Sequence, residues 1–341
     1  MKAIEITAPG DVRIVERPAP SCGPGDALLR VRRVGFCGTD LSTYRGANPL
    51  VDYPRIPGHE IGATIEQLGA DVTGDWQVGQ QVLVIPYTHC GACAACQSGR
   101  PNCCARNQTL GVQRDGAMTE LIAVPTAKLL SSARLSLAEL ALVEPLTIGF
   151  HAAARGRVAA DETVAVLGCG AIGLGVIAGA AFRGARVVAV DVDEQKLSLA
   201  RQCGAAEALN SAAVDLHESL QALTGGHGPQ VVVEAVGSPG TFRSAVDEVA
   251  FAGRVVYIGY AKAPVEYDTK LFVLKELDIL GSRNALAGDF ADVLRMLEER
   301  TFPVSSVITQ TVDFAAAGEA FRQWRDAPAT VTKIQLAIGE E

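Results

Sequence analysis

The sequence predicts an α/β protein in which an irregular β domain is joined to a doubly wound parallel sheet. Two changes of pattern along the chain lead to this prediction, because short turn-bounded strands come first and alternating strands and helices follow. The chain has 341 residues, of which 48% are hydrophobic and 20% charged, as in a well-packed globular protein. This length accommodates one very large domain or two of ordinary size.

The irregular β domain is expected over residues 1–145. Short segments rich in β-branched residues, each bounded by Gly, Pro, Asp or Asn, are typical of strands joined by turns. They are residues 27–36, 59–69, 80–87 and 118–125.

The parallel sheet is expected over residues 146–281. Apolar strand candidates alternate there with helical patterns, which predicts parallel strands with helices on both faces. The strand candidates are 163–168, 185–191, 230–237 and 254–260, and the helical patterns between them are 193–204 and 241–253.

The alternation of strand and helix patterns does not continue in residues 282–341. They contain helix candidates at 288–300 and 317–326 and a last strand candidate at 332–339. We expect this tail to return to the first domain. Because no Pro/Ser-rich linker occurs, we also expect the two domains to pack closely, with a cleft between them.

Charge and hydropathy exclude several classes of function. The 30 basic and 38 acidic residues give a net charge of −8, so no basic field exists to bind nucleic acid or an anionic membrane. The N-terminal residues lack the apolar segment of a secretory signal, which predicts a cytoplasmic protein. Residues 163–182 carry no charge over the length of a membrane span, but their five glycines favour a buried strand, loop and helix.

A glycine-rich motif follows the first strand candidate of the parallel sheet. Gly168, Gly170 and Gly173 form the pattern G-x-G-x-x-G, with Ile172 inside it. The first glycine allows a tight turn, the second lets a pyrophosphate approach the backbone, and the third lets helix pack on strand. Asp191 ends the next strand candidate, where a carboxylate accepts hydrogen bonds from ribose hydroxyls. The motif predicts a dinucleotide site, and a purely structural glycine turn is the alternative.

The dinucleotide is predicted to be NAD. NADP would require a basic group for its additional phosphate, whereas Asp191 and Asp193 would repel it. Gly237 and Gly259 each end a later apolar strand and are candidate cofactor contacts, although glycine is also common there in any doubly wound sheet.

Four cysteines have the spacing of a structural metal site. They are Cys90, Cys93, Cys96 and Cys104, in the pattern C-x2-C-x2-C-x7-C. Four thiolates suit a tetrahedral zinc ion and leave no open coordination position, so this site would stabilise a loop and take no part in chemistry. Cys103 is an equally near candidate for the fourth position. An iron–sulfur cluster or a set of free thiols is the alternative.

A second candidate metal site combines residues that lie far apart in the sequence. Cys37, His59 and Glu144 offer a thiolate, an imidazole and a carboxylate and leave a position for water or substrate, as a catalytic zinc requires. Because adjacent residues on a straight strand point to opposite sides, we expect Glu144 to be the direct ligand and Glu60 a water-mediated or exchanging one. Two roles are open to Asp40, which either orients His59 or caps a helix starting at Leu41.

The order of several motifs resembles that of the zinc-containing medium-chain dehydrogenases/reductases, over essentially the whole chain. These motifs are GFCGTD, PGHE, the cysteine lobe at about 86–110, EPL and LGCGAIG. The resemblance implies a GroES-like catalytic domain built from both termini, a Rossmann domain between them, and an active site in the cleft. The sequence is most similar to the branch of sorbitol, threonine and L-galactonate dehydrogenases, and VIPYTHCGACAACQSGRPNCC and GSRNA are similar to its L-galactonate 5-dehydrogenase-like members.

The resemblance also implies roles for individual residues. It makes Cys37 and His59 zinc ligands, with Glu60 and Glu144 as carboxylates at the metal, and it selects Cys104 over Cys103. Thr39 matches the family residue whose hydroxyl contacts the substrate oxygen and passes its proton outward. Many members continue this relay with a histidine, but here that position is Ser42, so a water chain or Tyr44 would have to carry the proton. Tyr44 is also a candidate substrate contact.

The activity implied is the NAD-dependent oxidation of a secondary alcohol by an enzyme with one catalytic and one structural zinc per chain. A small hydroxylated substrate is expected, with L-galactonate or L-gulonate first, and with sorbitol, galactitol, 2,3-butanediol or L-threonine as alternatives. Arg283 and Asn284 follow a strand candidate and are predicted either to hold a substrate carboxylate or to contact the cofactor or the domain interface. A homodimer or homotetramer is expected. A non-catalytic NAD-binding sensor is the alternative from a different class.

Overall fold

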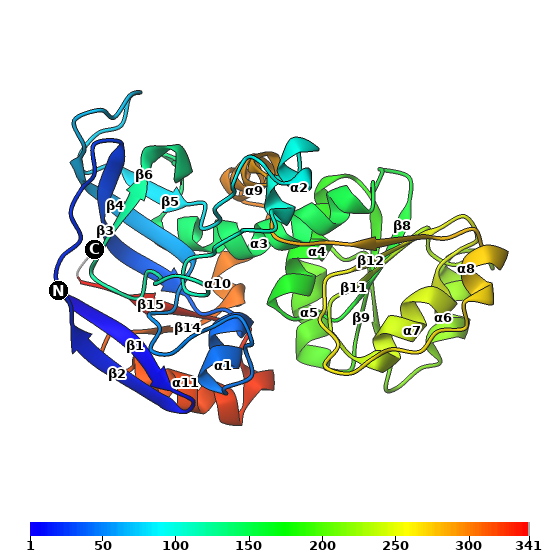
Figure 1. Cartoon of the computed structure of the whole chain (residues 1–341). Coiled ribbons are helices and arrows are strands. Elements are labelled where there is room, and N and C mark those ends of the chain that lie inside the picture. The colour runs from blue at the N-terminus through cyan, green and yellow to red at the C-terminus, as the bar shows by residue number, and fades with distance from the viewer. Residues whose placement is uncertain (340–341) are drawn as a thin grey trace. The chain divides into compact units, whose positions relative to one another are not determined.

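The computed structural model of the protein describes residues 1–339 and divides the chain into two compact units (Figure 1). Unit 1 consists of Met1–Glu144 and the chain from Val304 onward, and unit 2 consists of Pro145–Pro303. The first and last segments of the chain therefore belong to the same unit.

Unit 1 is built on a mainly antiparallel sheet with the strand order β14-β15-β3-β4-β5-β7, and β6 also pairs with β3. A separate antiparallel hairpin joins β1 to β2. The C-terminal strand β15 pairs with β3, with Leu336 opposite Val34, so both ends of the chain contribute to one sheet. The strands are β1 (Lys2–Ala8), β2 (Asp11–Glu16), β3 (Asp26–Gly35), β4 (Glu60–Leu68), β5 (Gln81–Val84), β6 (Leu121–Pro125), β7 (Leu129–Leu130), β14 (Ile308–Val312) and β15 (Lys333–Ala337).

Helix α11 (Ala317–Asp326) packs on the core of unit 1 through one apolar face. Its buried residues are Ala317, Ala320, Phe321 and Trp324, which follow the i, i+3, i+4, i+7 spacing of an amphipathic helix. The ring of Phe321 stacks on Phe36 with 4.7 Å between centroids. The shorter helices of this unit are α1 (Gly38–Tyr44), α2 (Ala94–Gln97) and α10 (Val304–Val307). Phe36 directly precedes Cys37, so this stack anchors the segment that carries the predicted ligand.

Unit 2 contains six parallel strands in the order β10-β9-β8-β11-β12-β13. Counted along the chain this is 3-2-1-4-5-6, the order in which ligands bind outside the carboxyl ends of the two central strands. The strand order runs in both directions from β8, and with the right-handed crossovers usual for parallel strands this places helices on both faces of the sheet. Val231–Val233 of the central strand β11 are fully buried, as in a strand covered on both faces. The predicted α/β class and doubly wound sheet are confirmed.

The elements of unit 2 follow one another as alternating strands and helices. They are β8 (Thr163–Leu167), α4 (Ala171–Phe182), β9 (Arg186–Asp191), α5 (Glu194–Gln202), β10 (Glu207–Asn210), α6 (Leu216–Leu223), β11 (Val231–Glu234), α7 (Pro239–Glu248), β12 (Arg254–Tyr257), α8 (Lys270–Leu274), β13 (Asp278–Gly281) and α9 (Ala287–Glu298). The sequence analysis missed β10 and α6. The segment EALN of β10 has no β-branched residue and forms an edge strand, so its sequence carries little strand signal.

The domain boundary expected at residue 282 differs from the structure, in which the chain leaves unit 2 only at Val304. Helix α9 is the reason, because it packs on helices of unit 2. The buried carboxylate of Asp289 lies 2.8 Å from Nδ1 of His151, and the guanidinium of Arg295 lies 4.7 Å from the ring centroid of Phe182 in α4. The alternation of strand and helix patterns ends after residue 281 because the last strand of the sheet ends there, whereas the unit continues.

The longest helix, α3 (Leu137–Arg155), runs through the division between Glu144 and Pro145. By length and composition it could cross a membrane, but 83% of its most apolar window is buried inside the protein, as in the core helix of a globular domain. The uncharged segment 163–182 forms β8, the glycine loop and α4, as predicted.

Candidate functional site

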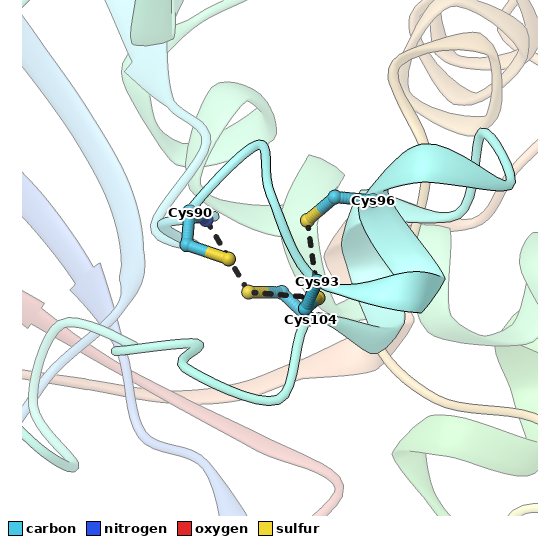
Figure 2. Close-up of side chains that lie close together, drawn as sticks. All are labelled: Cys90, Cys93, Cys96 and Cys104. Atoms are coloured by element: carbon cyan, nitrogen blue, oxygen red, sulfur yellow. Dashed lines mark hydrogen bonds between the residues drawn. The ribbon is translucent and has the colours of Figure 1, made fainter.

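The four predicted cysteine ligands converge in one loop of unit 1 (Figure 2). The sulfur atoms of Cys90, Cys93, Cys96 and Cys104 all lie within 4.8 Å of one another. The Sγ of Cys93 lies 3.5 Å from that of Cys96 and 3.9 Å from that of Cys104. Four sulfurs at such separations provide the closed tetrahedral set typical of a structural zinc ion.

Cys103 lies outside this group. Its sulfur accepts a hydrogen bond from the guanidinium of Arg100 at 3.7 Å, whereas Cys104 is the buried member of the four. Backbone hydrogen bonds, first from Ala105, lower the pKa of Cys93 to about 6, while burial raises the pKa of Cys96 to about 11. Backbone hydrogen bonds, first from Ala92, also lower the pKa of Cys90, so the cluster contains two thiols that ionise more readily than usual. The thiolate is the form that binds metal.

A second group brings together Cys37, His59 and Glu60, whose ligand atoms also lie within 4.8 Å of one another. His59 is 5% exposed and Glu60 is fully buried. The Nδ1 atom of His59 is buried and makes no hydrogen bond within residues 1–339. Buried polar atoms are nearly always partnered, so a buried imidazole with an unpartnered nitrogen, next to a thiol and a carboxylate, fits a zinc site better than ordinary core packing.

Glu60 occupies the place in this group that the sequence analysis expected for Glu144. That expectation assumed a straight strand, but His59 precedes β4 and follows Gly58, whose φ of 100° turns the chain. The alternation of side chains therefore does not separate His59 from Glu60. Glu60 lies opposite Gly35 in β3, and a Cβ atom at Gly35 would collide with the Glu60 carboxylate.

Glu144 lies near this group without belonging to it. Its buried carboxylate accepts a hydrogen bond from the hydroxyl of Tyr87. Burial is the main cause that raises the pKa of Glu144, and the neighbouring His59 acts in the opposite direction. The arrangement thus offers two carboxylates close to His59, of which Glu60 and not Glu144 shares the group with Cys37.

Asp40 ties the two halves of the group together through the backbone. Its Oδ2 accepts a hydrogen bond from the N–H of Cys37 at 2.9 Å, and its Oδ1 accepts one from the N–H of Gly58 at 3.3 Å. Of the two roles open to Asp40, the structure contains a helix cap, but the helix starts at Gly38 and not at Leu41. Asp40 is the third residue of α1, and its bond from the N–H of Cys37 closes a capping box at the start of this helix. Asp40 therefore fixes the residue next to His59 relative to Cys37.

The charges around His59 are those of a cation site. Burial by itself would lower the pKa of His59, but Cys37, Asp40 and Glu144 outweigh it and raise that pKa well above the usual value. An excess of acidic groups around one buried imidazole stabilises positive charge at this point.

Lys333 is a component of this site that the sequence analysis missed. Its Nζ donates hydrogen bonds to both carboxylate oxygens of Glu60, at 2.6 and 2.8 Å, and to the carbonyl of Phe36 at 3.1 Å. Lys333 is 4% exposed. A single lysine inside the apolar strand candidate 332–339 was the available signal, because lysine is almost never fully buried without a partner.

Thr39 lies in the first turn of α1, with its Oγ1 3.6 Å from the sulfur of Cys37. Ser42 is half-buried on the same helix. Tyr44 is 2% exposed, and its ring lies 5.4 Å from that of Phe321 in the core. This position does not fit the substrate contact or proton relay considered for Tyr44, because α1 turns that side chain towards α11.

In unit 2 the glycine motif forms the turn between β8 and α4. Gly168 has a φ of 97°, and a Cβ atom at Gly173 would collide with the carbonyl of Gly168. Gly170 is the cap residue directly before α4, and apart from its neighbours in the chain no atom lies within 4 Å of the position that a Cβ would occupy there. Open backbone N–H groups at a helix N-terminus favour phosphate binding. Ile172 is half-exposed in the first turn of the helix.

Asp191 connects the end of β9 to the glycine loop. Its Oδ2 accepts a hydrogen bond from the N–H of Cys169 at 2.7 Å. Gly237, with a φ of 84°, and Gly259 follow the ends of the neighbouring strands β11 and β12. Glycine loop, Asp191 and both later glycines therefore lie at the carboxyl ends of the parallel strands, where a dinucleotide binds in this strand order.

Arg283 and Asn284 follow the last parallel strand, β13, in unit 2. Arg283 is exposed, and Asn284 is half-buried with a φ of 49°. The Cys37 group belongs to unit 1, so the structure does not bring these two residues together with it within one unit.

Comparisons with known proteins agree with both units. The Alcohol dehydrogenase GroES-like domain matches residues 23–134, and the family Zinc-binding dehydrogenase matches residues 171–299. An uncharacterized zinc-type alcohol dehydrogenase-like protein of Haemophilus influenzae is 36% identical over 340 residues, which are 99% of each chain. L-galactonate-5-dehydrogenase of Escherichia coli is 36% identical over 308 residues, 90% of each chain. A crystal structure of an alcohol dehydrogenase, rspB, of Escherichia coli complexed with NADH has a TM-score of 0.91 at 30% identity and covers 99% of both chains.

The fold and the two groups of metal ligands thus define a zinc-type medium-chain dehydrogenase. The chain belongs to the zinc-type alcohol dehydrogenase family and is an oxidoreductase. The predictions of this family, of a GroES-like domain with a Rossmann domain, and of zinc and a nicotinamide dinucleotide as cofactors are confirmed.

Proposed function

We propose that this protein is an NAD-dependent dehydrogenase that oxidises one secondary alcohol of a sugar acid to a ketone, with L-galactonate and L-gulonate as the first candidate substrates. The observation that carries this proposal is the open ligand group of Cys37, His59 and Glu60 with the hydroxyl of Thr39 beside it. Sorbitol, galactitol, 2,3-butanediol and L-threonine are the alternative substrates.

Cys37 and His59 would hold the catalytic zinc, with Glu60 or Glu144 as the third ligand. When bound, zinc supplies the Lewis acid that lowers the pKa of a substrate hydroxyl. The thiolate of Cys37 and one carboxylate balance the two positive charges of the ion, so a second carboxylate would weaken its acidity. Lys333 holds Glu60 and Tyr87 holds Glu144, and these two contacts control how closely each carboxylate approaches.

Thr39 would accept the proton that the substrate hydroxyl loses. Its Oγ1 lies 3.6 Å from the sulfur of Cys37, so this hydroxyl is next to the group of candidate ligands. A threonine hydroxyl accepts one hydrogen bond while donating another, so it passes a proton on and keeps no charge. Water would complete the route from Thr39 to solvent.

The glycine loop and Asp191 favour NAD as the hydride acceptor. Gly170 leaves the N-terminus of α4 open for the pyrophosphate, and Asp191 stands at the end of β9 for the ribose hydroxyls. Asp193 adds a second negative charge where NADP would carry its phosphate. Cys90, Cys93, Cys96 and Cys104 would hold the structural zinc.

A sugar acid is favoured because the relative named L-galactonate-5-dehydrogenase is 36% identical over 90% of both chains. Arg283 is exposed and provides a guanidinium that pairs with carboxylates in a bidentate geometry. Asn284 would assist it.

The test is to assay the zinc-loaded protein with NAD against a panel of substrates and to monitor each reaction by the absorbance of reduced nicotinamide. L-galactonate, L-gulonate, sorbitol, galactitol, 2,3-butanediol and L-threonine are compared. We expect turnover with an aldonate that Cys37→Ser abolishes and that Cys22→Ser, a control outside both cysteine groups, leaves intact. Turnover with a simple polyol or threonine alone would replace the sugar acid, and turnover that survives Cys37→Ser would contradict the catalytic metal.

A second copy of the chain is the proposed partner, and it would bind the free edge of β13. This strand ends the six-stranded sheet, and apolar side chains are exposed beside it: Val273 (83%), Leu274 (63%) and Ile279 (39%). Unpaired strand edges of this kind pair with another chain. Light scattering should report a homodimer, or a homotetramer if a further surface contributes, and Ile279→Lys should yield a monomer. A monomeric wild-type protein would contradict this partner.

A further inference from the structure

Glu234 is a fully buried carboxylate at the carboxyl end of β11, and no role assigned above uses it. Its Oε1 accepts three hydrogen bonds, from the N–H of Val236 at 2.9 Å, the N–H of Gly237 at 2.8 Å and the hydroxyl of Thr241 at 2.7 Å. One oxygen atom therefore fixes the turn that follows β11 and the first turn of α7.

This turn lies against the glycine loop at the centre of the sheet. Glu234 pairs with Leu167, the residue before Gly168, and the N–H of Ala235 donates to the carbonyl of Leu167 at 2.9 Å. A Cβ atom at Gly168 would meet the side chain of Val236. Strands β8 and β11 are the two between which the strand order reverses, and a dinucleotide crosses the sheet at this point.

The second oxygen of Glu234 has a different environment. Oε2 is buried and has no hydrogen-bond partner in the described residues 1–339, and a Cβ atom at Gly259 would fall against it. A buried polar atom without a partner opposes folding, because the folded protein does not replace the hydrogen bond that the atom makes with water. A buried carboxylate with one unpartnered oxygen does not stabilise the core. We therefore look for the role of Glu234 in the turn that its other oxygen holds.

We propose that Glu234 is a positioning residue for the cofactor, which holds Val236 and Gly237 in the conformation that receives the nicotinamide half of NAD. In this strand order the half of the sheet with the glycine loop and Asp191 binds adenosine, and the half that starts at β11 binds the other nucleotide. This inference rests on the proposed function, because it requires that unit 2 binds NAD.

The hydrogen bonds at Oε1 predict different effects for different substitutions of Glu234. All three donors meet at Oε1, so the amide oxygen of Gln can replace it, whereas Asp is one methylene too short and Ala has no acceptor. We expect Glu234→Gln to retain the NAD affinity within about threefold, and Glu234→Ala and Glu234→Asp to weaken it about tenfold or more, since each lost hydrogen bond changes an equilibrium by roughly that factor. The affinity for 5′-AMP should change by less than about threefold in all variants, because adenosine binds the other half.

The experiment is isothermal titration of the zinc-loaded full-length protein with NAD and, separately, with 5′-AMP, together with the thermal unfolding midpoint of each variant. Glu248→Ala is the matched control, since Glu248 is also buried in unit 2 but pairs with His217 at 2.9 Å, away from this turn. It should lower the unfolding midpoint and leave the NAD affinity unchanged. If Glu234→Ala does not fold, Glu234→Asp and Thr241→Val carry the same comparison.

Two results would overturn the role of Glu234. In the first, Glu234→Ala or Glu234→Asp binds NAD as tightly as wild type. In the second, NAD and 5′-AMP affinity fall together and in proportion to the loss of stability, as a purely structural residue would produce. If the wild-type protein binds 5′-AMP and NAD equally weakly or not at all, the proposed cofactor itself is wrong. The titration of the wild-type protein alone shows this, so failure of the proposed function is separate from failure of the role of Glu234.

Discussion

Lys333 and Glu60 form a buried ion pair in which the Nζ of Lys333 lies 2.6 and 2.8 Å from the two carboxylate oxygens of Glu60. The two residues are 273 positions apart and come from the last and the fourth strand of unit 1. Glu60 shares its group with Cys37 and His59, so the C-terminal strand sets the charge at the candidate catalytic centre. Burial alone would lower the pKa of Lys333, but Glu60 outweighs it and keeps the ammonium charged.

Lys333→Met should destabilise the protein strongly, because it leaves the charge of Glu60 buried without its partner. Breaking one half of a buried pair costs about 3–5 kcal/mol of unfolding free energy. Urea unfolding measures this loss. The double variant Lys333→Met/Glu60→Gln should recover a large part of it, because neither charge then remains. A double variant no more stable than Lys333→Met would show that the lysine acts through its other contact, the carbonyl of Phe36.

Cys104→Ser and Cys103→Ser should differ in zinc content. Cys104 belongs to the four-sulfur group, and Cys103 does not. We expect one zinc ion per chain to be lost in Cys104→Ser and none in Cys103→Ser, measured by atomic emission on dialysed protein. Because a closed structural site stabilises its loop, limited proteolysis should cut Cys104→Ser between residues 86 and 110. Loss of zinc in both variants would contradict this choice of ligand.

Alkylation of the protein after removal of zinc should proceed in a fixed order. The pKa of Cys93 is about 6 and that of Cys96 about 11, so at pH 7 Cys93 is mostly thiolate and Cys96 is thiol. Iodoacetamide followed by peptide mapping should label Cys93 first, and this labelling should slow as the pH falls below about 6. Burial raises the pKa of Cys169 and Cys203 to about 12, so both should stay unlabelled in the folded protein. Faster labelling of Cys96 than of Cys93 would refute the order.

Thr39→Val should reduce kcat about 100-fold or more, the usual contribution of a positioned proton-transfer group, while zinc content and NAD affinity stay unchanged. Thr39→Ser retains the hydroxyl and should restore most of the activity. Ser42→Ala is the control on the same helix and should stay close to wild type, because the proposed route passes from Thr39 to water without Ser42. Steady-state kinetics on the best substrate of the panel measure all three. Equal activity of Thr39→Val and wild type would exclude Thr39 from the proton path.

Much of this molecule follows from local sequence. Apolar strands in alternation with amphipathic helices require a doubly wound sheet, and the spacing of Gly168, Gly170 and Gly173 after β8 requires a tight turn into α4. The four cysteines lie within fifteen residues, so short loop closure alone brings Cys90 near Cys104. Local spacing carries these features because their members are neighbours in the chain.

Tertiary structure decided what depends on distant segments. Sequence could not show that Lys333 meets Glu60, because the pairing of β15 with β3 and of β3 with β4 joins residues from opposite ends of the chain. The sequence could not show that Glu60, and not Glu144, shares a group with Cys37 and His59, since this depends on the turn at Gly58 before β4. Helix α9 belongs to unit 2 because Asp289 and Arg295 find their partners there. Buried charges are placed by the partners that compensate them, and those partners are defined only once the chain is folded.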